Sequence, residues 1–202
     1  MNEPTIEELI DLARRAPAPP GQDLVGASEE EIDGLESEIG RSLSPASRGW
    51  LRAVNGAMLG PGGIFGVRKA KDFLSIRKHL NIYPEWRTKG WIPIASDGVG
   101  NYWVVIPQGP DGNPDWVAFI DIHEDPGSID RYFASSVPRF IKFLLESELG
   151  ERRWPTDRAY DLEHDQALIA APEEKAPWSP RLASIHRLIG DLLGCVNVKG
   201  AL

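Results

Sequence analysis

Three runs of aromatic and β-branched residues follow one another closely in the middle of the chain, and they constrain its fold more than any other feature. The runs are Trp91–Ala95, Tyr102–Ile106 and Trp116–Ile122, and their composition is that of β-strands. The link after the second run, Pro107–Asp115, consists almost entirely of turn-forming residues. Both links are too short for the helical crossover that parallel neighbours need, so the strands are expected to pair antiparallel.

Four helical patterns precede the strands. Thr5–Ala16 and Ser28–Ile39 each start with a hydroxyl residue that is followed three positions later by Glu, which is the spacing of a capping box. A third helix is expected from Ser44–Pro45, a cap and a first residue, to Asn55–Gly56, where positive φ angles are tolerated. A fourth helix is predicted over Ala70–Leu80 from its apolar spacing.

A glycine-rich segment and a well-marked helix complete the pattern. Leu59–Gly66 is predicted to be a turn that leads into a short strand near Phe65–Val67, because the Lys-Ser/Thr pair of a phosphate-binding loop does not follow its last glycine. After the strands, Ser136–Leu149 has a capping serine, a proline in the first turn and an apolar face. Helices, then strands, then helices, without alternation, predict an α+β fold: an antiparallel or mixed sheet flanked by N- and C-terminal helices.

The length of 202 residues suits one domain with appended segments. We divide the chain into an N-terminal helix with a Pro-rich linker (1–25), a central domain (26–150) and a C-terminal extension (151–202). The extension shows no firm periodicity until a predicted helix over Pro180–Leu193, which Ser179 would cap. This extension is expected either to pack back on the domain or to mediate self-association.

The charge balance favours some partners over others. Thirty acidic side chains oppose 22 basic ones, a formal charge of −8, which argues against direct binding to duplex nucleic acid. It favours a basic protein partner because opposite fields speed encounter, although solubility alone explains the same charge. The N-terminus has no signal-peptide pattern, no run is long enough to span a membrane, and the one cysteine is Cys195. These features predict a cytoplasmic protein without an internal disulfide or a paired-thiolate metal site.

His123 is the strongest candidate for chemistry. It follows a strand that ends in Asp121–Ile122, and Glu124–Asp125 come next. A histidine with carboxylates at a strand end could do acid–base work or bind a hard metal. The alternative, which we favour, is an acidic surface turn with a solvated or hydrogen-bonded imidazole.

A second loop has only a superficial likeness to a nucleotide-binding segment. Asp97–Asn101 (DGVGN) has too few glycines for the dinucleotide fingerprint, and a strand follows it in place of a helix. It is predicted to be a tight turn in which Asp97 and Asn101 bond the local backbone. Trp86 and Trp178 lie in polar, proline-rich surroundings, and one of the two is a candidate exposed anchor for a partner. No motif indicates a catalytic residue, a metal site or a cofactor.

Several of these pieces, taken in order, resemble a known family. They are the helix with Ile32, Leu35 and Glu36, then Leu43, Trp50–Leu51 before Asn55–Gly56, the segment Pro93–Asn101 with its Asp-Gly-x-Gly-Asn, the strand Trp116–Asp121, and a helix with Phe140, Phe143, Leu144 and Leu145. Together they resemble the SUKH superfamily, which includes fungal cell-wall assembly regulators and many bacterial immunity proteins, over about residues 26–149. The chain departs from the family pattern at Ser44, which separates Leu43 from Pro45.

The resemblance implies that residues 26–150 form a SUKH-like binding domain, which in many bacterial members neutralises a toxin, often a nuclease. It supplies no catalytic motif, and the matching positions are interpreted as structural: Asn55, Gly56, Asp97, Gly98, Gly100 and Asn101. Our first hypothesis is therefore a non-enzymatic immunity-type protein with a basic toxin domain as partner, and with neither nucleic acid nor membrane bound directly. Its predicted binding surface contains Asp97, Asp121, His123, Glu124 and Asp125.

Two other hypotheses stay open. A hydrolase, either metal-dependent or acid–base, would use His123 with Asp121 or Glu124. A scaffolding or self-associating subunit would use the terminal helix over Pro180–Leu193. The sequence does not decide the oligomeric state.

Overall fold

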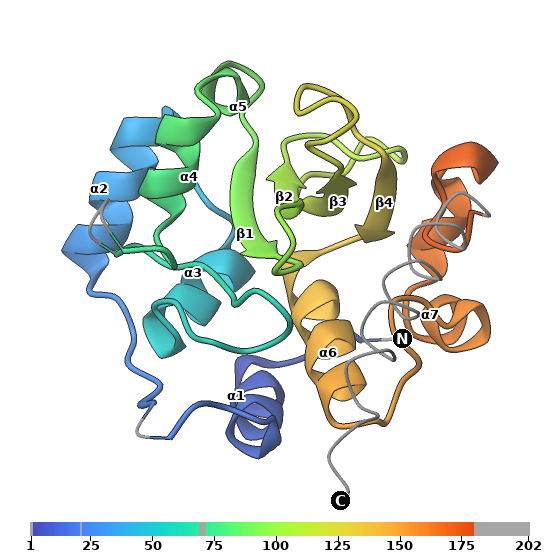
Figure 1. Ribbon diagram of the computed structural model, residues 1–202, viewed down its shortest axis with the longest axis horizontal. Coiled ribbons are helices and arrows are strands. Elements are labelled where there is room, and N and C mark those ends of the chain that lie inside the picture. Colours follow the sequence, from blue (N-terminus) through green and yellow to red (C-terminus); the bar gives the residue numbers. More distant parts are fainter. Residues whose placement is uncertain (1, 21, 69–71, 180–202) are drawn as a thin grey trace, which may run out of the picture.

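The computed structural model describes residues 2–20, 22–68 and 72–179, and its centre is one antiparallel sheet (Figure 1). The strands are β1 (Ile92–Ser96), β2 (Tyr102–Ile106), β3 (Trp116–Ile120) and β4 (Arg131–Ala134), in the spatial order β1-β2-β3-β4. All three pairings are antiparallel, with a register shift in the first and the third. The α+β prediction is therefore confirmed, and the three predicted strands are present. The fourth strand was not predicted from the sequence.

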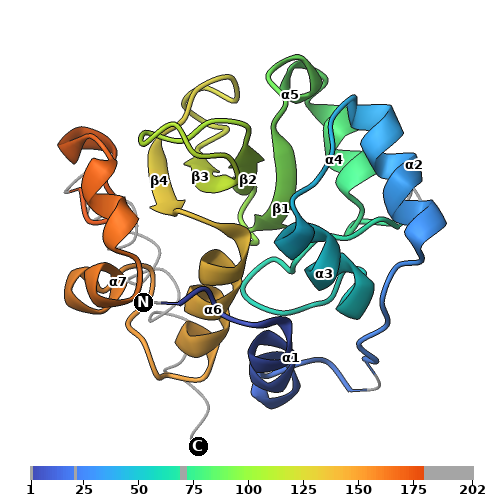
Figure 2. The same cartoon turned by 180° about the vertical axis from the view of Figure 1, so that it is seen from behind.

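Helices stand on both sides of the strands in the sequence, as expected. The α-helices are α1 (Ile6–Arg15), α2 (Glu29–Ile39), α3 (Pro45–Ala53), α4 (Ile76–Ile82), α5 (Glu85–Thr88), α6 (Val137–Glu148) and α7 (Arg158–His164). Two short 3₁₀ helices follow, η1 (Gln166–Ala170) and η2 (Glu173–Lys175). Helices α1, α3 and α6 pack against one another beside the sheet (Figure 2). No helix of the described part of the chain is long and apolar enough to cross a membrane.

Local sequence signals explain where the first two helices begin. Thr5 and Ser28 each accept a hydrogen bond from the backbone N–H of the Glu three residues later, and each Glu side chain bonds back to the cap. Both predicted capping boxes are therefore present. They satisfy two backbone donors at each helix start, which would otherwise lack a partner.

Ser28→Ala is expected to lower the free energy of unfolding by about 1 kcal/mol, because the cap of α2 is lost. Chemical denaturation of the two proteins measures this difference. Ser37→Ala is the matched control: Ser37 is an exposed residue of the same helix, and its replacement should not destabilise. Equal losses in both variants would contradict the capping role.

The segment between α3 and α4 differs from its prediction. Over the first described residues of the predicted helix, from Asp72, the structure has a turn: the Asp72 carboxylate accepts from Leu74 N at 2.9 Å and its carbonyl from Ser75 N at 3.0 Å. Helix α4 starts only after this turn, because an Asx-type turn competes with the helical hydrogen-bond pattern. Near Phe65 the structure has isolated bridges, Ile64 to Ala95 and Gly66 to Ser75, in place of the predicted strand.

The sheet is covered on both faces. Adjacent residues of a strand point to opposite faces, and the two aromatic residues that begin β2 show this clearly. Trp103 contacts the ring of Phe140 in α6 at 5.6 Å between centroids. Tyr102 contacts His79 of α4 and Trp86 of α5 at 5.0 and 5.3 Å on the other side. The buried sheet therefore holds its strand-end loops on a rigid support.

The described part of the C-terminal extension packs back on the domain. Trp154 lies 5.6 Å from Trp103 of the sheet, and Asp165 accepts hydrogen bonds from the backbone and hydroxyl of Ser135 at the end of β4. The 3₁₀ helices η1 and η2 thus lie beside β4, and α7 packs against η1 (Figure 1). The predicted terminal helix over Pro180–Leu193 lies outside the described residues.

Candidate partner-binding end of the sheet

Two loops meet at one end of the sheet. Because the strands form an antiparallel meander, the β1–β2 turn (97–101) and the β3–β4 loop (121–130) leave the sheet at the same end. Asn101, which is buried, joins them: its side-chain oxygen accepts a hydrogen bond from Ile122 N at 3.2 Å. The structure therefore brings together the two segments that hold the five predicted binding residues.

The first of these loops is a closed turn built around Asp97. One carboxylate oxygen accepts from the backbone N–H of Val99 and of Asn101, both at 2.9 Å, and the other accepts from the Asn101 side chain at 2.8 Å. Gly98 has a φ of 79°, and a Cβ there would lie 2.6 Å from the carbonyl oxygen of Pro61. The local bonding predicted for Asp97 and Asn101 is present, and it leaves Asp97 as an anchor of the turn.

The other family-matching pair, Asn55–Gly56, lies at a close crossing of two backbone segments. Gly56 has a φ of 79°, and an added Cβ would lie 3.2 Å from the backbone nitrogen of Gly66. Asn55 N donates to the carbonyl of Val25 at 2.7 Å, which holds the linker before α2. Asn55 and Gly56 therefore have a structural role, and they do not belong to either of the two loops.

The second loop is organised by Asp121, whose side chain is mostly buried. Its carboxylate accepts from His123 N at 2.9 Å, and its carbonyl accepts from Glu124 N and Asp125 N. The side chains of His123, Glu124 and Asp125 are exposed. In the described residues the His123 ring forms no hydrogen bond or ion pair with a carboxylate, so the pairing that a hydrolase hypothesis requires is not formed.

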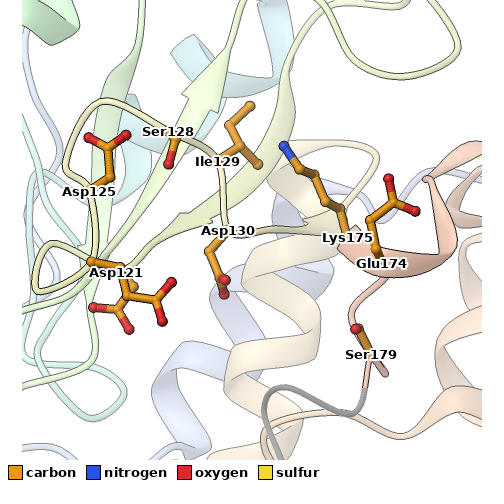
Figure 3. Close-up of a pocket in the computed structure, with 9 residues that line it drawn as sticks. Asp121, Asp125, Ser128, Ile129, Asp130, Glu174, Lys175 and Ser179 are labelled. Atoms are coloured by element: carbon orange, nitrogen blue, oxygen red, sulfur yellow. The ribbon is translucent and has the colours of Figure 1, made fainter.

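A pocket of about 310 Å³ opens beside this loop (Figure 3). Three predicted residues line it, Asp121, Glu124 and Asp125, whereas Asp97 and His123 do not. The lining residues that sequence reasoning missed are Ser128, Ile129, Asp130, Glu174, Lys175 and Ser179. The last three come from the C-terminal extension, so the pocket lies between the family-like domain and the segment that follows it.

Negative charge dominates this pocket. Its lining contains five carboxylates and one ammonium group, that of Lys175. Asp130 is compensated by the buried Arg131, whose Nε donates to it at 2.7 Å. Glu124 and Glu174 form no ion pair with any described residue. Within the same residues, no group of three or more His, Cys, Asp or Glu side chains could hold a metal ion. The pocket is therefore suited to the cationic side chains of a partner.

Neither of the two tryptophans considered as an exposed anchor is in the exposed class. Trp86 is fully buried, and its indole N–H donates to the carbonyl of Pro126 at 2.7 Å, which fastens the β3–β4 loop to α5. Trp178 is half-buried, with the guanidinium of Arg158 5.2 Å from its ring centroid. The prediction is wrong for Trp86, because its polar neighbours in the sequence belong to turns that fold over it.

Comparison with known families gives a match over most of the domain. A family model described as SMI1 / KNR4 family (SUKH-1) matches residues 26–142. The match begins before α2, includes both loops of the acidic end, and stops within α6. The extension that completes the pocket lies beyond it. A search of curated proteins found no match.

Proposed function

This chain belongs to the SMI1/KNR4 (SUKH-1) family, and on that premise we propose that it is a non-enzymatic immunity-type protein, which neutralises a toxin in the cytoplasm by binding it. The family supports a protein-interaction module of the immunity or regulatory kind. The step from this general role to toxin neutralisation is our proposal.

The observation that carries the proposal is the acidic pocket at the loop end of the sheet. Five carboxylates face one ammonium group there, and the whole chain has a net charge of −8. A toxin that acts on nucleic acid presents a basic surface, because phosphate binding requires one. Opposite potentials on the two proteins would speed their encounter and fix their relative orientation. Occupation of the toxin's substrate groove would then block its activity.

The hydrolase hypothesis has no comparable support. The carboxylate of Asp121 is engaged with the backbone of its own loop, and the imidazole of His123 bonds to no described acid. The scaffolding hypothesis depends on residues 180–193, and truncation after Ser179 tests it better than truncation after Gly150. Truncation after Gly150 would also remove residues that are buried in the domain, among them Arg152 and Leu168.

The proposal is tested by co-expressing the tagged full chain with the product of the neighbouring large open reading frame. A stoichiometric complex that dissociates in high salt, together with loss of that product's toxicity, is the expected result. No complex at low salt, or a complex that leaves the toxicity unchanged, would overturn the assignment.

Replacing Glu124 and Glu174 together by Gln is expected to lower the association rate constant with that partner about two- to tenfold at low ionic strength, because steering is weakened. Stopped-flow mixing at several salt concentrations measures the effect. The charge-matched control is Glu7→Gln with Glu30→Gln, two exposed residues on α1 and α2. If both double variants slow association equally, the pocket has no special part in recognition.

A further inference from the structure

His79 is a buried titratable residue that the proposed function does not use. It lies on α4 with 7% of its surface exposed. Its ring stacks on Phe65, with centroids 4.1 Å apart and planes 17° from parallel, and contacts Tyr102 of β2 at 5.0 Å. The imidazole is therefore held between two aromatic rings and away from water.

Among the described residues this ring has one polar contact, which fixes the tautomer of its neutral form. His79 Nε2 lies 2.8 Å from the carbonyl oxygen of Phe73. A carbonyl can only accept, so Nε2 carries the proton and donates it. Nδ1 is buried and has no hydrogen-bond partner among the described residues. A second proton on Nδ1 would place a charge and an unpaired N–H in an apolar site, which is costly.

Within the described residues, the elements around His79 offer no compensating charge. On α4, Lys78 directly precedes His79 and repels a cationic ring, and Arg77 pairs with Glu38 at 2.7 Å. In the preceding turn, Asp72 pairs with Arg68, also at 2.7 Å. His79 itself forms no ion pair with any residue that the structure describes.

The hydroxyl groups nearby stay neutral. Burial, and then the neighbouring Tyr83, raises the pKa of Tyr102 to about 12. Burial and Glu85 likewise raise the pKa of Tyr83. Neither phenol can therefore supply a negative charge to a protonated His79 near neutral pH.

The Phe73 carbonyl belongs to the turn that starts α4. In this turn Ser75 N donates to the carbonyl of Asp72, Gly66 N to the carbonyl of Leu74, and Ile76 N to the carbonyl of Gly66. The turn thus joins α4 to the segment beside Gly56, and the hydrogen bond from His79 closes it. We propose that His79 is a pH-sensitive contact. Its protonation at Nδ1 is disfavoured in the buried site, so the cationic ring favours an open state in which it leaves this site, and the Asp72–Ser75 turn opens together with the start of α4.

The direction of the pH dependence follows from burial. Burial, the largest cause, lowers the pKa of His79 below its ordinary value of 6.5. A group whose pKa is lowered by folding favours the closed state fully above its ordinary pKa, and this stabilisation is lost as the pH falls toward the lowered value. Mild acidification should therefore open the turn, whereas alkaline conditions should not affect it.

Hydrogen exchange of the backbone amides of Leu74, Ser75 and Ile76 in the full chain tests whether protonation of His79 opens the turn. After correction for intrinsic exchange rates, the opening equilibrium should rise up to about tenfold per pH unit below 6.5. His79→Gln, which keeps a side-chain donor but cannot titrate there, should abolish this rise. His123→Gln, at an exposed histidine, should retain it. An unchanged pH dependence in His79→Gln would overturn the proposal.

A measurement on the unaltered protein covers the case in which His79→Gln does not fold. Nitrogen NMR of the histidine rings should show His79 with a proton on Nε2 and none on Nδ1 at pH 7.5. The midpoint of the His79 titration should lie below the ordinary histidine value of 6.5. A midpoint for His79 at or above the ordinary value would contradict the proposal as directly as the exchange experiment.

Discussion

Arg152→Ala is expected to lower the free energy of unfolding by about 3–5 kcal/mol, because it leaves a buried carboxylate without its partner. Arg152 and Asp161 have fully buried side chains, and the Arg152 Nε lies 2.7 Å from a carboxylate oxygen of Asp161. Denaturant unfolding followed by circular dichroism measures the loss. Removing one member of a buried ion pair lowers stability strongly even where the intact pair contributes little to it.

The position of Arg152 explains why its loss should affect more than one contact. Its guanidinium also donates to Ser147 of α6 at 2.9 Å and to the carbonyl of Pro155 at 3.2 Å, and it lies 4.9 Å from the ring centroid of Phe143. The same side chain therefore fastens the beginning of the extension to the last helix of the family-like domain.

Two variants make this prediction decisive. Arg153→Ala changes an exposed arginine one position away and should cost little. The double replacement Arg152→Met with Asp161→Leu removes both charges and should recover much of the stability, because no buried charge is left unpaired. If Arg152→Ala costs no more than Arg153→Ala, the extension is not anchored in the way that the ion pair indicates.

The helices and strands that could be predicted from the sequence have strong local signals. The capping boxes at Thr5 and Ser28 involve residues three positions apart, and the aromatic density of β2 and β3 marks buried strands without any long-range information. Strand β4 lacks such a signal. It has four residues and begins with Arg131, whose charge is acceptable in a buried position only because Asp130 compensates it.

The candidate site was predicted only in part, because some of its residues are brought there by long-range contacts that leave no local signal in the sequence. The meeting of the Asp97 turn with the loop after Asp121 follows from the hairpin order, so the sequence could indicate it. The wall formed by Glu174 and Lys175 could not be predicted, because Asp165 places this segment by bonding Ser135, thirty residues earlier. In the sequence such charged residues are typical of an exposed loop.

Trp103→Ala is expected to lower the free energy of unfolding by about 3–5 kcal/mol, because it leaves a large cavity in the core. Trp103 is almost fully buried in β2, and its ring contacts three aromatic residues of the domain and one of the extension: Phe119, Phe133, Phe140 and Trp154. Thermal or chemical unfolding measures the loss. Trp103→Phe should cost much less, because it keeps an aromatic ring in place and removes an indole N–H that has no partner in the described residues.

A double-mutant cycle on Trp103 and Trp154 tests the expectation that the extension packs back on the domain, as opposed to mediating self-association. Their rings meet edge to face, with centroids 5.6 Å apart, so replacing both by Ala should reveal a coupling of about 0.5–1.5 kcal/mol. The same cycle with Trp178, which packs beside Arg158, should be additive within about 0.5 kcal/mol. No coupling between Trp103 and Trp154 would mean that the extension does not pack on the sheet in solution. The pocket would then lose its second wall, since Glu174 and Lys175 follow Trp154 along the same segment.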